Sequence, residues 1–276
     1  MTRFQRLLFF LPPWLFAAGA VAQGKFINIG YTNCLSVTNC PRAQLDKIGQ
    51  LKWYFAHASV GANMIDGITE LHQRDPNTFQ FQAVASSGTP PASTRAGAIY
   101  EHQRGNPGWK AKLDLFHSAV SNGWRAPAID IALNKLCFID QTASLTYYLN
   151  SMTNLEAAYP QTVFAYATIP LTTTEDADNR LRSLFNTRLR EWCRANGRVL
   201  FDIADIEAHD PAGAPSTFSF KGKIYQRLFG GYTEDGGHLN AEGRQLVARG
   251  FYALGAAVLD RKAETAPAPA PQASTP

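Results

Sequence analysis

The sequence has few charged residues and no block of residues of one sign. Only 17% of its 276 residues are charged, and the formal net charge is +4. Because the basic residues are scattered and cannot neutralise a row of phosphates, we expect no nucleic-acid partner. A hydrophobic fraction of 45% with 12% aromatics excludes disorder over the bulk of the chain. The sequence contains no internal repeat and no low-complexity linker that would divide it, so we predict one domain.

Long hydrophobic runs are absent except at the N-terminus. Residues 7–21 are apolar, Arg3 and Arg6 precede them, and the small-x-small sequence Ala20-Val21-Ala22 follows. This order is typical of a cleaved signal peptide, which we place at residues 1–22. The alternative is an uncleaved anchor, for which a run interrupted by two prolines is short. We therefore expect an exported protein, periplasmic or secreted, with no stable membrane span after cleavage.

Removal of this segment leaves a domain expected at residues 23–262. Loss of Arg3 and Arg6 lowers the formal net charge from +4 to +2. Residues 263–276, AETAPAPAPQASTP, are rich in Pro and Ala and cannot build a core, so we expect a disordered tail. Oligomeric state is not indicated by any pattern in the sequence.

Cysteine is scarce, and neither Cys nor His occurs at metal-ligand spacing. The chain has four Cys and six His, without a CxxC or HxxxH pair, so we expect no metal site. Cys34 and Cys40 are six apart, and in an oxidising compartment their spacing favours a disulfide over two free thiols. Cys137 and Cys193 are interpreted as buried small apolar residues, with pairing between them left open.

Strand-like and helix-like segments alternate along the domain. The expected strands are 51–56, 79–84, 128–133, 162–168 and 198–203, and the expected helices are 60–73, 109–121, 142–158, 176–195 and 241–259. This alternation predicts an α/β fold, a three-layer α/β/α sandwich with about five parallel strands of the flavodoxin-like type. Sites in such sheets lie at the carboxyl ends of the strands.

Two connections in this scheme are long. Residues 85–108 follow the second expected strand and residues 204–240 follow the fifth. Loops of this length in a compact domain are usually functional. Within the second of them, 217–228 resembles a small hairpin with its turn at Lys221-Gly222-Lys223, either a flap over a site or a packing element.

Ser59 is placed where a nucleophile can act. It stands in YFAHASVGAN, residues 54–63, between the first expected strand and the first expected helix. Backbone N–H groups and the helix dipole favour developing negative charge at such a turn. The structural alternative is that Ser59 only caps the helix.

Asp235 and His238 are three residues apart in TEDGGHLN, immediately before the last expected helix. At that spacing the carboxylate can reach Nδ1 of the imidazole and leave Nε2 free as a base. The alternative is a surface Asp beside an unrelated His. Because a doubly wound sheet can bring its first and last strand ends together, we expect Ser59, Asp235 and His238 to form a catalytic triad.

Over residues 50–258 the sequence resembles the SGNH hydrolases, also called the GDSL family. The DGGH block at 235–238 followed by Leu-Asn is its best match, and Ser59 matches the nucleophile block in position. The family's Gly-Asp before the serine is replaced by His57-Ala58. The resemblance implies hydrolysis of esters through an acyl-enzyme, with no metal or organic cofactor.

The resemblance also implies an oxyanion hole. Its donors would be the backbone N–H groups of Ser59 and of Gly88, in ASSGTP after the second expected strand, and the side chain of Asn134. Asn134 stands in ALNKLCFID without the family's Gly-x-Asn-Asp, and Lys135 follows it. His57 and Lys135 are further candidates to line the site. Their alternatives are a hydrogen-bonded structural His and a solvated charge at a strand end.

The expected function is thus that of an exported serine esterase acting on a small-molecule or carbohydrate ester, such as an O-acetyl group on a polysaccharide. The carbohydrate expectation rests on family analogy and compartment. Two alternatives remain: an acyltransferase with the same triad, and a non-catalytic domain of the same fold that binds envelope polysaccharide. The missing Gly-Asp favours the second alternative, and the intact DGGH opposes it.

Overall fold

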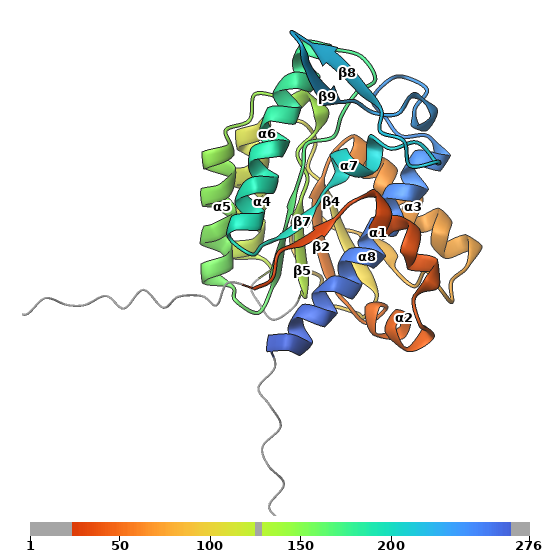
Figure 1. Ribbon diagram of the computed structural model, residues 1–276. Coiled ribbons are helices and arrows are strands. Elements are labelled where there is room, and N and C mark those ends of the chain that lie inside the picture. The colour runs from red at the N-terminus through yellow and green to blue at the C-terminus, as the bar shows by residue number, and fades with distance from the viewer. Residues whose placement is uncertain (1–23, 125–128, 266–276) are drawn as a thin grey trace, which may run out of the picture.

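The computed structural model describes residues 24–124 and 129–265 (Figure 1). The expected signal peptide, residues 1–22, lies outside the described residues. So does most of the expected tail, although helix α8 (Ala241–Thr265) extends three residues into it. No helix in the described part of the chain is both long enough and apolar enough to cross a bilayer.

A seven-stranded sheet forms the centre of the molecule, and every pair of neighbouring strands in it is parallel. Its order is β1-β7-β6-β5-β2-β4-β3. The strands are β1 (Ile27–Ile29), β2 (Trp53–His57), β3 (Gln82–Ala85), β4 (Ala98–Gln103), β5 (Ile131–Asn134), β6 (Val163–Ala167) and β7 (Val199–Phe201). The predicted α/β fold is confirmed, with seven parallel strands in place of about five.

The sequence analysis missed two of these strands. Strand β1 has only three residues, too few for a recognisable period. Strand β4, AIYEHQ, lies inside the stretch 85–108 that was expected to be one long loop. Its polar residues Glu101 and His102 are half-buried, and each forms a hydrogen bond with a side chain of β2. Because polar residues occupy these partly buried positions, β4 lacks the apolar pattern from which a strand is predicted.

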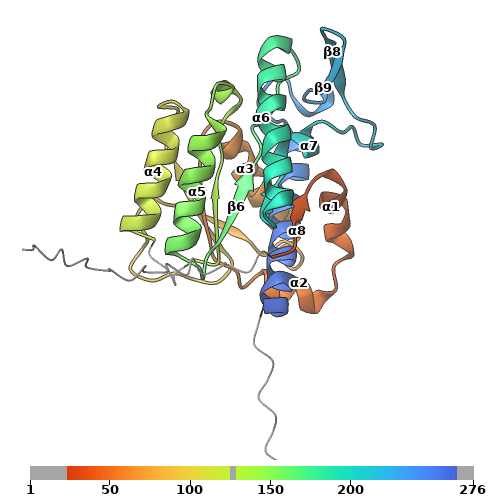
Figure 2. The same ribbon diagram turned by 60° about the vertical axis from the view of Figure 1, so that its left-hand side comes forward.

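Helices cover both faces of the sheet. They are α1 (Tyr31–Ser36), α2 (Arg42–Ile48), α3 (Val60–Arg74), α4 (Trp109–Asn122), α5 (Leu145–Ala158), α6 (Asp176–Ala195), α7 (Ile203–Glu207) and α8. Helices α1, α2 and α3 pack with α8 on one face, and Figure 2 shows α4, α5 and α6 side by side on the other. Strand β2 is buried on both faces: Trp53 and Phe55 belong to one apolar core, and Tyr54 and Ala56 belong to the other.

The direction of winding reverses between β2 and β5. From β2 the chain adds β3 and β4 on one side, and then β5, β6 and β7 follow on the other. In parallel sheets the loops after two such strands diverge and leave a crevice at their carboxyl ends. Ser59 follows β2 and Asn134 ends β5, so both border this crevice.

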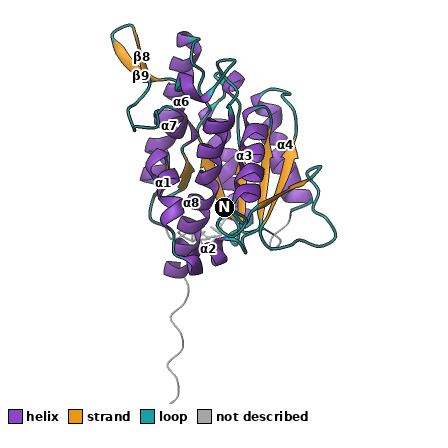
Figure 3. Ribbon diagram, turned by 90° about the vertical axis from the view of Figure 1, so that its right-hand side faces the viewer, coloured by secondary structure: helices purple, strands orange, loops and turns teal. Residues whose placement is uncertain are grey.

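The predicted hairpin is present as β8 (Thr217–Phe220) and β9 (Lys223–Gln226). Its turn residues Lys221 and Gly222 have φ values of 50° and 74°, the left-handed pair of a tight two-residue hairpin. Arg180 of α6 stacks on Phe220, which ties the hairpin to that helix. Figure 3 shows the hairpin projecting at the end of the molecule opposite the end of α8.

The expected disulfide between Cys34 and Cys40 is wrong, because both are free thiols in the structure. Cys34 lies inside α1, is fully buried, and donates its S–H to the carbonyl of Gly30. Cys40 follows the 3-10 turn Val37–Asn39 and is only half-buried. Burial raises the pKa of the Cys34 thiol. Cys137 and Cys193 are buried, free and unpaired.

Candidate active site

Ser59, His238 and Asp235 form a continuous hydrogen-bonded relay. Ser59 Oγ lies 2.6 Å from His238 Nε2, and His238 Nδ1 lies 2.7 Å from Asp235 Oδ2. The His238 and Asp235 side chains are 45% and 58% exposed. The three residues expected to act together are therefore in contact, at an open surface that a substrate can reach.

Ser59 sits in a strained strand-to-helix turn. Its φ of 54° is positive, which is uncommon for a residue with a side chain. It occupies the N-cap position of α3, yet its side chain makes no capping hydrogen bond. The hydroxyl is turned to His238 instead, so the alternative of a purely structural cap does not hold. A strained turn that exposes a serine Oγ is the geometry of a nucleophile elbow.

Asp235 is held as an anion by its own loop. Its Oδ1 accepts the backbone N–H groups of Gly237 at 2.9 Å and His238 at 2.8 Å. These backbone bonds, followed by the side-chain bond to His238, hold the pKa of Asp235 well below its usual range. The charged carboxylate fixes the proton on Nδ1 of His238, which leaves Nε2 to accept a proton from Ser59.

Three contacts fix the loop that carries His238. Asn63 of α3 accepts the N–H of Leu239 at 3.1 Å. The N–H of Thr173 donates to the carbonyl of Gly236 at 2.9 Å. The ring of Phe138 meets the imidazole of His238 edge-on, with 5.5 Å between ring centroids. Sequence reasoning missed Asn63 and Phe138, because no local motif marks a residue that acts through a contact across the sheet.

Asn134 lies at the end of β5, beside the nucleophile turn. It is fully buried and pairs in register with Ala56 of β2. Its Oδ1 accepts from Arg104 Nη2 at 2.6 Å, whereas its buried Nδ2 has no hydrogen-bond partner in the part of the chain that the structure describes. A buried donor without a partner is costly unless a ligand satisfies it. This amide is therefore suited to bind an oxyanion.

Gly88 does not fit the predicted oxyanion-hole role. It follows the edge strand β3, and β4 separates that strand from β2. Its N–H donates to Ser86 Oγ at 3.2 Å, so the donor is already used. The glycine that follows the strand next to β2 is Gly105, exposed and with φ of 73°. Gly88 was expected in this role because β4 was not predicted, so that β3 was taken as the strand next to β2.

His57 and Lys135 lie beneath the site rather than along its surface. His57 is 1% exposed, its Nε2 is 2.7 Å from Glu101 Oε2, and burial lowers its pKa. Lys135 is fully buried, donates to Cys137 Sγ at 3.4 Å, and also has its pKa lowered by burial. His57 is thus a hydrogen-bonded structural residue, and Lys135 is not a solvated strand-end charge.

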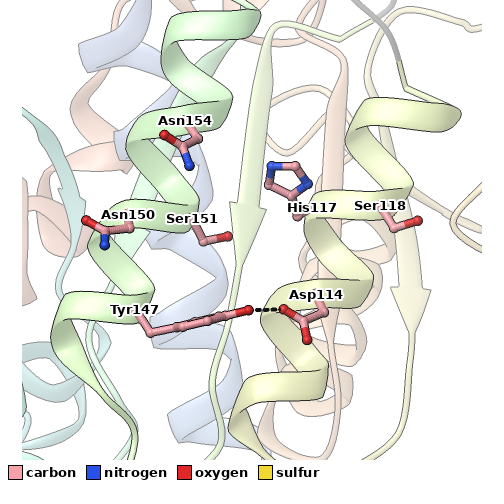
Figure 4. Close-up of a pocket in the computed structure, with 7 residues that line it drawn as sticks. All are labelled: Asp114, His117, Ser118, Tyr147, Asn150, Ser151 and Asn154. Atoms are coloured by element: carbon pink, nitrogen blue, oxygen red, sulfur yellow. Dashed lines mark hydrogen bonds between the residues drawn. The ribbon is translucent and has the colours of Figure 1, made fainter.

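The described residues offer no metal site, and a surface groove lies apart from the triad. In residues 24–124 and 129–265 no group of three His, Cys, Asp or Glu side chains could hold a metal ion. A shallow polar groove of about 380 Å³ lies between α4 and α5 (Figure 4). It is lined by Asp114, His117, Ser118, Tyr147, Asn150, Ser151 and Asn154. None of these belongs to the triad.

Comparisons with known proteins give only distant likenesses. No family model and no curated protein matches the chain. A Bacteroides fragilis structure assigned as an acylhydrolase has 13% identity and a TM-score of 0.49, covering 76% of this chain and 86% of its own. One from Streptococcus pneumonia, assigned as a platelet activating factor, has 14% identity and a TM-score of 0.43, with 79% and 96% covered. An acetyl esterase mutant with acetate ion has 13% identity and a TM-score of 0.45, with 78% and 100% covered.

Proposed function

We propose that this protein is a serine esterase that works through an acyl-enzyme. The observation that carries the proposal is the relay from Ser59 Oγ to His238 Nε2 at 2.6 Å and from Nδ1 to Asp235 at 2.7 Å. Nucleophile, base and orienting carboxylate each stand within hydrogen-bond reach, which is the arrangement that acyl transfer needs.

In the proposed mechanism each group has one role. His238 removes the proton of Ser59 as Ser59 Oγ attacks the ester carbonyl, and the carbonyl π electrons move onto the oxygen. His238 then gives that proton to the leaving alkoxide as the C–O bond breaks. Water, deprotonated by the same imidazole, attacks the acyl-enzyme and releases the acid and Ser59. Asp235 stays charged and stabilises the imidazolium in both halves.

The oxyanion requires donors beside Ser59. Asn134 Nδ2 is one, since it is buried beside the nucleophile turn and has no other partner. The backbone N–H of Ser59 is the second. Gly105, after β4, replaces Gly88 as the candidate for the third, because β4 is the direct neighbour of β2. Donors aimed at the developing charge usually contribute the largest part of such catalysis.

The family, the location and the substrate belong to the same proposal. The DGGH block and the position of Ser59 support membership of the SGNH hydrolases, without a metal or organic cofactor. The N-terminal pattern supports export to the periplasm or outside the cell. A carbohydrate O-acetyl ester suits that location and the exposed, polar triad. An acyltransferase remains the second candidate, because only the accepting nucleophile differs.

A fluorophosphonate probe tests the proposal directly. A working Ser59 becomes covalently labelled, as shown by a mass shift on the peptide that contains it, and Ser59→Ala does not label. Ser86→Ala is the matched control, since Ser86 follows β3 and should label like wild type. Absence of labelling in wild-type protein would instead support the non-catalytic binding domain. Release of acetate, compared with acetylation of an added glycan, separates esterase from acyltransferase.

A further inference from the structure

Arg104 reaches across the end of β2 to the end of β5. It follows β4, and β2 lies between β4 and β5. Its backbone N–H donates to the carbonyl of His57 at 3.0 Å, which fastens it beside the nucleophile turn. From there Nη2 donates to Asn134 Oδ1 at 2.6 Å and to the carbonyl of Lys135 at 2.9 Å. Through its backbone and its guanidinium together, Arg104 thus connects the ends of three strands.

The hydrogen bond from Arg104 determines which end of the Asn134 amide faces the guanidinium and which end faces away from it. A primary amide has an accepting oxygen and a donating nitrogen of nearly equal size. Because the guanidinium can only donate, it accepts no contact from Nδ2 and selects the rotamer that places Oδ1 against it. Nδ2 is then the end that has no hydrogen-bond partner among the described residues, and it lies buried beside the nucleophile turn. Without Arg104, either orientation would be available.

Among the described residues, no carboxylate accepts a hydrogen bond from the charged Arg104 side chain. Its bonds go to the side chain of Asn134 and to the carbonyls of Lys135 and Lys112, the last at 3.3 Å from Nε. The nearby carboxylate of Asp140 is engaged by Lys112 Nζ at 2.5 Å and by the N–H of Cys137 at 2.7 Å. Burial lowers the pKa of Arg104 only to about 10, so it is charged at neutral pH.

We propose that Arg104 is a positioning residue for the oxyanion hole, which holds the Asn134 amide with Nδ2 directed to the reacting carbonyl oxygen. The positive charge at Oδ1 polarises the amide and strengthens Nδ2 as a donor. The inference rests on the proposed ester hydrolysis and deepens it. The contribution of Arg104 is realised as the oxyanion forms, so it belongs to the transition state and not to substrate binding.

The test compares Arg104→Met and Arg104→Lys with wild type on p-nitrophenyl acetate. For Arg104→Met we expect kcat to fall about 10–100-fold with KM changed less than about twofold. The rate of fluorophosphonate labelling of Ser59 should fall in parallel, because phosphonylation also develops charge on an oxygen. Arg104→Lys keeps the charge and one donor and should recover part of kcat.

A double variant separates this role from a merely structural one. If Arg104 acts through Asn134, Arg104→Met should change kcat less than about twofold in an Asn134→Ala background. Arg198→Met is the matched control: Arg198 also joins two elements, through Glu156 at 3.0 Å, but it lies immediately before β7, away from the site. It should lower Tm and leave kcat unchanged.

The possible results distinguish the role of Arg104 from the proposed esterase function. Equal labelling and equal kcat in wild type and Arg104→Met overturn this inference alone. A raised KM with unchanged kcat also overturns it, because Arg104 would then bind substrate directly. Multiplicative losses in the double variant overturn the action through Asn134. If Arg104→Met does not fold, Arg104→Lys and its double variant give the same comparison. A wild-type protein that neither labels nor hydrolyses overturns the proposed function and this inference with it.

Discussion

Asn63 on α3 accepts the backbone N–H of Leu239 at 3.1 Å, a contact between residues 176 positions apart. Each partner is close in sequence to a triad member: Asn63 follows Ser59 by four residues and Leu239 follows His238 by one. The bond therefore sets the distance between nucleophile and base. It joins the two segments whose approach creates the site.

Replacing Asn63 by Ala should weaken catalysis without removing it. Loss of one hydrogen bond costs about 1 kcal/mol, so we expect kcat/KM to fall about 5–20-fold as His238 loses its alignment with Ser59. Steady-state hydrolysis of p-nitrophenyl acetate measures this. Asn63→Asp keeps the accepting oxygen and should retain more activity. Equal activity in the two variants would mean that the bond does not align the base.

Ser59→Ala should abolish nearly all turnover. We expect kcat to fall about 10³–10⁶-fold, because the residual rate then comes only from binding and the oxyanion donors. Since Ser59 makes no capping bond, Tm should change little. Thermal unfolding followed beside hydrolysis checks both statements. A variant with near wild-type turnover would remove Ser59 from the mechanism.

If the proposed triad operates, acid should inactivate the protein through one group. Backbone donors hold the pKa of Asp235 far below its usual value, so the carboxylate stays charged well into the acid range. Only protonation of the base then contributes, and log(kcat/KM) against pH should have a slope no steeper than 1 on the acid side. Asp235→Asn should lower kcat about 10²–10⁴-fold. A slope near 2 would show that Asp235 also titrates.

Asn134 and Gly88 should respond in opposite ways. Asn134→Ala removes an oxyanion donor, and we expect kcat to fall about 10²–10³-fold. Gly88→Ala places a Cβ 2.8 Å from the His102 ring at a φ of 86°, which strains the fold and should lower Tm. Its kcat should stay within about twofold of wild type, because the Gly88 N–H is bound to Ser86. A large kcat loss in Gly88→Ala would restore its predicted role.

Lys112 and Asp140 form a buried ion pair near the site, with the two side chains 0% and 3% exposed. Lys112→Met leaves Asp140 buried with only the N–H of Cys137 as a donor, so we expect unfolding free energy to fall by about 3–5 kcal/mol. Urea unfolding measures this. Lys110→Met is the matched control. Because the ion pair of Lys110 with Asp114 is exposed, its loss should lower the unfolding free energy by less than about 1 kcal/mol. Equal losses of unfolding free energy in the two variants would show that burial does not increase the cost of breaking the ion pair.

Local sequence determined the elements whose information lies within a few residues. Asp235 reaches His238 because the two residues are only three positions apart and Gly236 adopts the positive φ of 90° that the turn requires. The strand-to-helix turn at Ser59 follows from an apolar run that precedes a segment with helical periodicity. The alternation of strands and helices likewise determined a parallel sheet, since each crossover helix returns the chain in the same direction.

Tertiary structure alone decided which chain segments are neighbours. Strand β4 inserts between β3 and β2, which moves Gly88 away from Ser59 and brings Arg104 to Asn134. The thiol of Cys34 lies in the apolar core and donates to the carbonyl of Gly30 instead of pairing with Cys40. Strand order and helix rotation are set by the packing of two apolar cores and by hydrogen bonds between residues far apart, such as Asn63 and Leu239. Periodicity in a sequence records which face of an element is buried, but not which element buries it.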